Sequence, residues 1–183
     1  TTKQYTIAPA DVVPTEKTVY LKKGDVFLKD NGTELQLTFD VAEEKNPTLS
    51  PDGNYVGYTK NNNLYTFSLV TKKEVAITND GATGILNGYA SWVYFEEIFG
   101  RPTQYRAFWW SPDSKYISFM RFDERKVPMF PIYNSEGQHG FVEETRYPKV
   151  GDPNPTVKIG WATPTGGKIT WADFNDQEDQ YFG

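Results

Sequence analysis

Apolar and polar residues alternate over short stretches in the first half of the chain, which is the pattern of half-buried β-strands. Residues 18–21 lead through a Lys-Lys-Gly-Asp turn into residues 26–28, and an Asp-Asn-Gly turn then leads into residues 35–37. An Asn-Gly pair between two alternating stretches is a strong signal for a tight β-hairpin. We therefore predict three short antiparallel strands in this segment.

The same arrangement repeats further along the chain. Alternating stretches at residues 55–58, 64–67 and 75–78 are separated by an Asn-rich turn and a Lys-rich turn. Matching the two sets of stretches gives a period of about 40 residues, which is typical of the blades of a β-propeller. The chain is thus predicted to be all-β, and a β-sandwich with unrelated turns is the alternative that this pattern leaves open.

A turn motif also occurs twice. The segment that begins at Ser50 reads SPDGNYVGY, and the segment that begins at Ser111 reads SPDSKYISF. Proline fixes its own φ angle, and Asp with Gly or Ser completes a turn before the alternating strand that follows. The two copies lie roughly 60 residues apart, so about 20 residues are inserted into the second unit of the repeat.

The inserted residues fall at about 84–104 and do not alternate cleanly. Ser91 is a residue type that caps helices, and Trp92, Phe95 and Phe99 follow it at helical spacing, which predicts a short helix. Insertions in repeat proteins map to loops on one face, often the binding face. The insertion is therefore the first place to look for a functional site.

The rest of the chain has a weaker pattern. After Phe119 it becomes rich in proline, and we expect irregular structure there. Residues 156–162 alternate again, and residues 168–171 are expected to open another hairpin. No linker or shift in composition divides the chain into two domains.

Two neighbouring acids, Glu96 and Glu97, are the candidate binding residues of the insertion. Consecutive residues of a helix point roughly 100° apart, so two carboxylates can approach one small cation from two sides. A protonated α-amine has three N–H donors and suits this arrangement, with Trp92 and Tyr94 as candidate pocket-framing side chains. A solvated Glu pair on a surface helix is the alternative.

Composition excludes several other classes of function. Aromatic residues make up 16% of the chain, which indicates a packed core, and the net charge of −5 without a basic cluster argues against nucleic-acid binding. The absence of cysteine excludes disulfides and thiolate zinc sites, and no apolar run approaches the ~20 residues that span a membrane. We expect neither a metal nor a cofactor.

Nucleophilic catalysis by this chain alone is not expected. The only histidine, His139, lies in a predicted loop, and no Gly-x-Ser-x-Gly motif is present. We therefore assign no catalytic residue to the chain.

The insertion and its flanks resemble the dipeptidyl peptidase IV family. That family carries a Trp-Val-Tyr-Glu-Glu-Glu-Val-Phe phrase shortly before a Trp-Trp-Ser-Pro corner, and here residues 92–99 read WVYFEEIF before WWSP at residues 109–112. Further matching phrases follow in the same order, at residues 127–128, 147–149 and 154–158.

This resemblance implies an N-terminal eight-bladed propeller, of which residues 1–183 would be a fragment of about four blades with a short helical insertion. The catalytic α/β-hydrolase domain with its Ser-Asp-His triad would lie outside this chain. Family members release Xaa-Pro and Xaa-Ala dipeptides from peptides with a free amino terminus, usually as homodimers. The resemblance also implies a secreted, periplasmic or cell-surface parent protein.

The last two Glu of the family phrase bind the substrate's α-ammonium, and they fall on Glu96 and Glu97. The first Glu of the family phrase is Phe95 here, and Gly100 stands where the family often has Ser. A family Arg that contacts the substrate's carbonyl region cannot be placed in this chain. A non-catalytic propeller that binds a protein or peptide, and the propeller of a tripeptidyl peptidase, remain the alternative functions.

Overall fold

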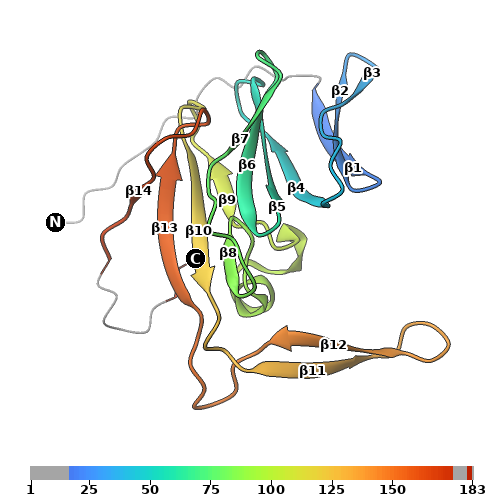
Figure 1. The fold of residues 1–183 in the computed structure, drawn as a ribbon, viewed down its shortest axis with the longest axis vertical. Coiled ribbons are helices and arrows are strands. Elements are labelled where there is room, and N and C mark those ends of the chain that lie inside the picture. Colours follow the sequence, from blue (N-terminus) through green and yellow to red (C-terminus); the bar gives the residue numbers. More distant parts are fainter. Residues whose placement is uncertain (1–16, 175–180, 183) are drawn as a thin grey trace.

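The computed structural model describes residues 17–174 and 181–182, and antiparallel strands dominate it (Figure 1). The first sheet has the order β1-β2-β3, and the second has the order β4-β5-β6-β7. Their strands are β1 (Thr18–Lys22), β2 (Asp25–Asp30), β3 (Thr33–Gln36), β4 (Glu44–Leu49), β5 (Tyr55–Lys60), β6 (Asn63–Ser68) and β7 (Lys73–Ala76). The strands predicted in the first 80 residues are all present, which confirms the all-β prediction.

A third sheet has the order β14-β13-β10-β8, with β9 paired to β10, and β11 and β12 form a separate hairpin. Their strands are β8 (Ile85–Asn87), β9 (Phe108–Trp110), β10 (Ile117–Asp123), β11 (Met129–Asn134), β12 (Phe141–Arg146), β13 (Thr156–Ala162) and β14 (Thr170–Trp171). The second sheet, with four antiparallel strands in sequence order, has the form of a propeller blade.

The tight turns form as their residues predict. Asn31 and Gly32 join β2 to β3 with φ angles of 48° and 81°, and Asn61 and Asn62 join β5 to β6 at 49° and 59°. Positive φ at both central positions gives the turn a twist that matches the flanking strands. Asn and Gly tolerate this conformation best, which is why they mark these turns in the sequence.

The repeated Ser-Pro-Asp motif makes the same turn twice. The Ser50 hydroxyl donates to Asp52 at 2.6 Å and accepts the Tyr55 N–H at 2.9 Å. The Ser111 hydroxyl makes the equivalent bonds, to Asp113 at 2.7 Å and from the Tyr116 N–H at 3.0 Å. Each turn connects a strand to the one beside it in the same sheet, β4 to β5 and β9 to β10.

Adjacent sheets pack face to face through apolar side chains. The cluster between the first two sheets includes Val26, Leu37 and Tyr58, and the cluster between the second and third includes Leu64 and Phe119. A Cβ added at Gly57 would lie 3.0 Å from Ile117 Cδ1 and 3.1 Å from Phe108 Cε2. Glycine at that position therefore allows the close approach of β5 to the third sheet.

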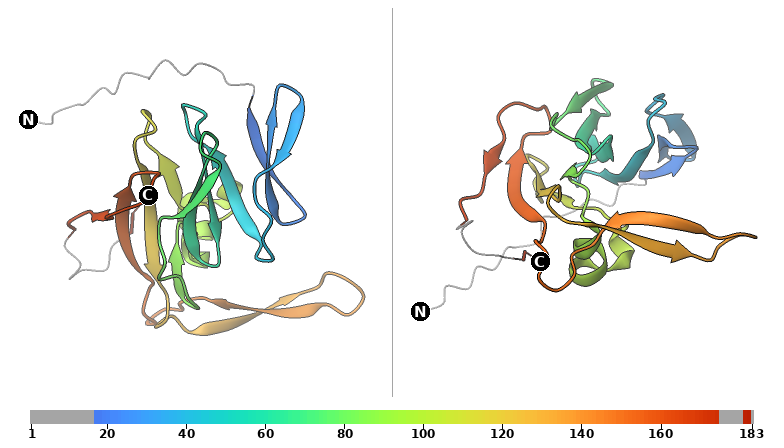
Figure 2. Two further views of the ribbon diagram at one scale, coloured as in Figure 1. Left: turned by 45° about the horizontal axis from the view of Figure 1, so that its top comes forward. Right: turned by 60° about the horizontal axis from the view of Figure 1, so that its bottom comes forward.

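The expectation of irregular structure after Phe119 was wrong for the β11–β12 hairpin, which extends away from the other sheets (Figures 1 and 2). Pro131 lies in β11 opposite Glu144. Proline lacks the N–H that a central strand needs, but in the described residues β11 pairs with β12 alone. A proline is tolerated on such an edge strand. His139 is exposed at the tip of this hairpin, as the loop prediction requires.

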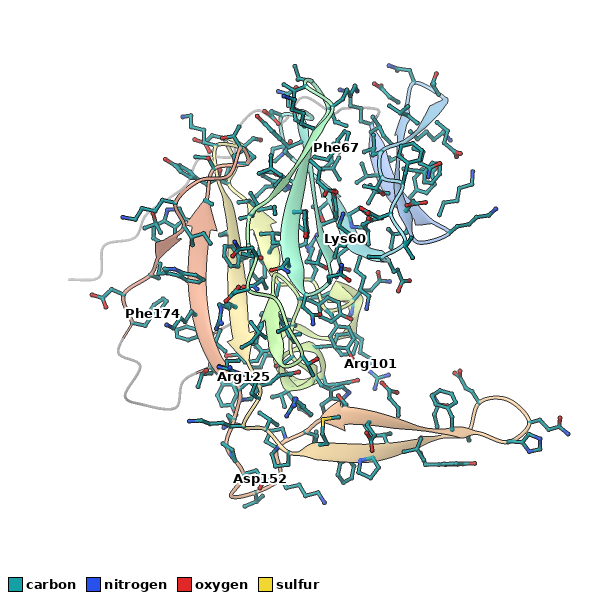
Figure 3. All side chains as sticks on the ribbon, in the orientation of Figure 1. Lys60, Phe67, Arg101, Arg125, Asp152 and Phe174 are labelled. Carbon is teal, nitrogen blue, oxygen red and sulfur yellow. The ribbon has the colours of Figure 1, made fainter. Side chains whose placement is uncertain are left out.

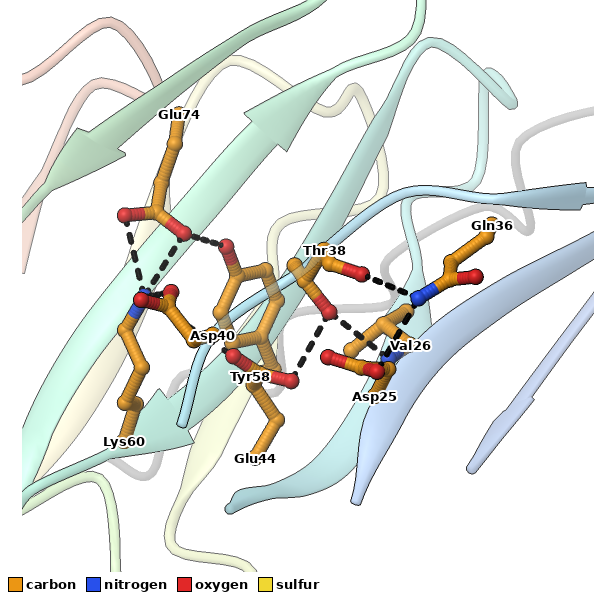
Figure 4. A network of polar contacts seen from close by, with 9 residues as sticks. All are labelled: Asp25, Val26, Gln36, Thr38, Asp40, Glu44, Tyr58, Lys60 and Glu74. Atoms are coloured by element: carbon orange, nitrogen blue, oxygen red, sulfur yellow. Dashed lines mark hydrogen bonds and ion pairs between the residues drawn. The ribbon is translucent and has the colours of Figure 1, made fainter. Parts of the chain in front are cut away.

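An ion network around the buried Lys60 and Glu44 lies in the second sheet, and Thr38 connects it to β2 of the first sheet (Figure 4). The Lys60 ammonium contacts the carboxylates of Asp40 and Glu74, and it lies 3.8 Å from that of the fully buried Glu44. Burial alone would lower the pKa of Lys60, but hydrogen bonds to Asp40 and Glu74 outweigh it, so the pKa is raised. Burial raises the pKa of Glu44, which the Thr38 hydroxyl partly offsets by donating to it.

Candidate functional site

The insertion (residues 89–106) is closed at its base by backbone hydrogen bonds. Tyr89 and Arg106 form an antiparallel bridge, and the Ala90 N–H donates to the Tyr105 carbonyl at 2.8 Å. The insertion is therefore a closed loop that leaves the third sheet after β8 and returns to it at β9. It contains a π-helix, η1 (Tyr94–Phe99), and a 3₁₀-helix, η2 (Arg101–Thr103).

The acid pair lies on η1, a helix type that is rare and frequently found at functional sites. The prediction that Ser91 caps this helix was wrong. The buried hydroxyl of Ser91 has no hydrogen-bond partner in the described part of the chain. The Ser91 carbonyl accepts a hydrogen bond from the Phe95 N–H at 3.0 Å, so Ser91 contacts the helix through its backbone. The residue before the helix, Val93, already has helical φ and ψ angles, so the chain enters η1 without a side-chain cap.

Aromatic packing holds η1 on the third sheet. Tyr94 is fully buried and meets the ring of Phe122 edge-on at 4.8 Å. Phe95 stacks on Tyr105 at 3.8 Å, and Trp92 meets Tyr147 edge-on at 5.0 Å. Tyr94 thus supports the helix from within the core, whereas Trp92 is only half-buried.

These contacts also change one detail of the sequence interpretation. Trp92, Phe95 and Phe99 follow one another at helical spacing, and in the structure Phe95 and Phe99 pack against the same buried cluster, whereas the described ring contact of Trp92 is with Tyr147.

The two acids have different surroundings. Glu96 is 16% exposed, and its Oε2 accepts a hydrogen bond from Arg101 Nε at 2.9 Å. Arg101 is 77% exposed and extends from η2, directly after the helix (Figure 3). Glu97 is exposed and has no ion pair among the described residues. One carboxylate of the pair is therefore already held by a cation, and the other is free to accept one.

The acid pair does not line either of the two main cavities found among the described residues. The larger cavity, of about 660 Å³, lies between β1, β4 and the end of η2, and Arg106 and Lys45 are among its lining residues. The smaller cavity, of about 310 Å³, is lined by the ends of β4 and β5 and by Tyr89. The pair therefore lies outside both cavities, and Glu97 is the exposed member of it.

Sequence reasoning missed Arg101, the cation that contacts Glu96. The signal was weak, because a Gly-Arg-Pro-Thr segment predicts a turn but does not show which acid the arginine reaches. Its position two residues after Phe99, at the end of the predicted helix, was the only available indication.

The model of the "Dipeptidyl peptidase IV (DPP IV) N-terminal region" matches residues 20–183. The chain belongs to the dipeptidyl peptidase IV family. Curated relatives include a probable dipeptidyl-aminopeptidase B of Arthroderma benhamiae, 42% identical over 124 residues that cover 61% of this chain and 13% of the relative. The dipeptidyl aminopeptidase B of Saccharomyces cerevisiae is 38% identical over 115 residues, covering 60% of this chain and 14% of the relative.

Solved structures of the family agree in fold. The crystal structure of Porphyromonas gingivalis dipeptidyl peptidase 4 matches with a TM-score of 0.70 and 26% identity, covering 87% of this chain and 23% of that one. A putative dipeptidyl aminopeptidase IV from Bacteroides ovatus matches with a TM-score of 0.62 and 25% identity, covering 91% and 22%. The chain thus spans a small part of its relatives. In the described residues, no helix is long and apolar enough to cross a membrane.

Proposed function

We propose that Glu96 and Glu97 bind the free α-ammonium of a peptide substrate in a dipeptidyl peptidase that releases Xaa-Pro and Xaa-Ala dipeptides. The observation that carries this proposal is the pairing of a free carboxylate on Glu97 with a neighbouring one on Glu96, both on a helix anchored by buried aromatic rings. An anchored helix keeps both acids in place, so the amino end of the peptide is positioned relative to a distant nucleophile.

Charge and hydrogen bonding favour an ammonium ligand. At ~4 Å and an effective dielectric constant of about 20, each carboxylate attracts an ammonium by on the order of 4 kcal/mol before desolvation is subtracted. Arg101 occupies one oxygen of Glu96 through a single N–H, and a carboxylate has further acceptor positions. Because Arg101 is mostly exposed, its ion pair is worth only about 0–1 kcal/mol, so it can shift when a ligand binds.

The proposal also covers the parts and properties of the whole protein that lie outside this chain, and membership of the family supports them. A hydrolase domain outside this chain would carry the nucleophile, and this region would admit the substrate and bind its amino terminus. The whole protein would act as a homodimer in a secreted, periplasmic or cell-surface location. The exposed apolar residues of the β11–β12 hairpin, Tyr133, Phe141 and Val142, offer one surface for the second copy.

Single substitutions in the whole enzyme test the acid pair. Glu96→Gln and Glu97→Gln should each lower kcat/KM for Xaa-Pro substrates with a free amine by about tenfold to a hundredfold, since each removes a charged hydrogen bond of about 1.5–3 kcal/mol. Glu136→Gln, at an exposed acid in the loop between β11 and β12, is the matched control. Unchanged kcat/KM in both pair variants would refute the proposal, and faster release of tripeptides than dipeptides would reassign the enzyme to the tripeptidyl class.

A further inference from the structure

The two cavities share part of their lining. Glu43, Lys45 and Tyr89 line both of them, so the cavities adjoin each other at β4. The acid pair lines neither cavity, and the proposed function therefore leaves the polar side chains of the larger one without a role. Those side chains are mainly hydrogen-bond donors, which points to a ligand of a different kind.

A bulge in β4 supplies one of these donors. The register of β4 against β5 shifts between Lys45 and Thr48, and Asn46 within the shift has a φ angle of 56°. Asn46 lines the larger cavity, and its Nδ2 is buried without a hydrogen-bond partner in the described part of the chain. A buried donor without a partner is costly and rare, and bulges are over-represented beside binding sites. We therefore expect this amide to donate to a ligand.

Two cations line the same cavity. The Lys45 ammonium lies 4.9 Å from the centre of the Tyr89 ring, and the half-buried Arg106 reaches the Thr48 hydroxyl through a long hydrogen bond of 3.4 Å. Neither cation makes an ion pair with another described residue. Thr48 is two residues beyond Asn46, so both cations and the free amide lie at the same part of β4.

The charge of the lining favours a singly charged anion. Glu43 is the only acid among the described residues that line the larger cavity, against the two cations Lys45 and Arg106, which leaves an excess of one positive charge. Guanidinium and ammonium groups donate hydrogen bonds and accept none, and the planar guanidinium fork matches the two oxygens of a carboxylate. A carboxylate therefore fits both the donors and the charge.

We propose that Lys45, Asn46 and Arg106 form a binding site for a carboxylate in the larger cavity. The carboxylate belongs to an acidic side chain of a peptide or to a carboxyl terminus, which present the same chemical group. A cavity of about 660 Å³ is large enough to accept either. The site goes beyond the proposed function, which concerns an ammonium held by other residues.

A stack of aromatic rings joins this site to the helix η1. Tyr89 lies nearly parallel to Tyr105 at 4.9 Å, and Tyr105 lies nearly parallel to Phe95 at 3.8 Å. Phe95 directly precedes Glu96, and the backbone of Tyr89 pairs with that of Arg106. The carboxylate site and the acid pair therefore lie at the two ends of one packed stack, and they share no polar side chain.

Calorimetric titration of the whole protein with N-acetylated tripeptides tests the site. The probes are Gly-Glu-Gly with an amidated carboxyl terminus, Gly-Gln-Gly with a free carboxyl terminus, and amidated Gly-Gln-Gly as the neutral peptide. At least one of the two carboxylate probes should bind at least about tenfold more tightly than the neutral peptide, and that probe identifies the source of the carboxylate. Equal binding of all three would overturn the inference.

Acetylation removes the α-ammonium, so the acid pair does not contribute to binding of these probes. The doubly substituted Glu96→Gln, Glu97→Gln protein should bind the preferred carboxylate probe as tightly as its parent does. Failure of the carboxylate site is thereby distinguished from failure of the proposed function. Tighter binding of inorganic phosphate than of either carboxylate probe would also overturn the assignment.

Substitution of the two cations locates the site. Lys45→Gln and Arg106→Gln should each weaken binding of the carboxylate probe about tenfold or more, since each removes a charge-assisted hydrogen bond. Lys168→Gln, at an exposed cation outside the cavity, is the matched control and should bind like the parent. Lys45 is exposed, so its variant should fold even where Arg106→Gln does not. Unchanged affinity in Lys45→Gln would overturn the inference.

Discussion

Replacing Lys60 by Met should destabilise the folded protein by about 3 kcal/mol, because the change leaves a buried carboxylate without its cation. Lys60 is 7% exposed and Glu44 is 0% exposed, whereas Asp40 and Glu74 are 48% and 33% exposed. Water can solvate Asp40 and Glu74 once the ammonium is gone, but it cannot reach Glu44. The cost therefore comes mainly from Glu44.

The size of the effect follows from the geometry. Removing one partner of a buried ion pair typically costs about 3–5 kcal/mol. The Lys60 ammonium lies 3.8 Å from Glu44, beyond hydrogen-bonding distance, so the lower end of that range applies. Urea unfolding of Lys60→Met should show a lower midpoint with an unchanged slope, and the exposed Lys168→Met should stay within about 0.5 kcal/mol of the parent.

The effect should also depend on pH. Burial raises the pKa of Glu44 in the folded state above its ordinary value, and loss of Lys60 raises it further. An acid with a raised pKa destabilises the folded state when it is ionised. The loss of stability in Lys60→Met should therefore be largest at neutral pH, and it should shrink as pH falls through the pKa of Glu44 in the folded state. Adding Glu44→Gln should recover part of the loss. A change below about 1 kcal/mol, or one that is independent of pH, would refute this reasoning.

Two other predictions concern the sheets. Gly57→Ala should lower the free energy of unfolding in urea by about 1–3 kcal/mol, because the new Cβ would lie 3.0 Å from Ile117 and 3.1 Å from Phe108. An unchanged unfolding midpoint would contradict this. Hydrogen bonds from Ser111 and Lys115 lower the pKa of Asp113 to about 2, so its stabilising contribution is present above pH 3.8 and is lost as pH falls toward 2. An NMR titration of Asp113 with a midpoint near 3.8 would contradict this.

Much of the fold could be predicted because its signals are local. The Asn31-Gly32 turn and the two Ser-Pro-Asp turns depend on residues that are close in sequence, and each formed as expected. The family resemblance was likewise carried by contiguous phrases, and the match over residues 20–183 confirms it. The number of blades in the closed ring stays a prediction.

The features that sequence reasoning missed depend on distant partners. Pro131 indicated a break, but it is tolerated because β11 is an edge strand in the described structure. The ion network of Lys60 joins residues from separate strands and loops, and no periodicity indicates which charges are buried together. Arg101 reaches Glu96 only because η2 follows the π-helix directly.

Calorimetry of a short Xaa-Pro peptide with the whole protein, in which the nucleophilic serine proposed for the hydrolase domain is replaced by alanine, measures binding of the amino terminus most directly. The doubly substituted Glu96→Gln, Glu97→Gln protein should bind the free-amine peptide about a hundredfold or more weakly than its parent. Both proteins should bind the N-acetylated peptide equally weakly. Equal affinity of the two proteins for the free-amine peptide would contradict the assignment of these acids.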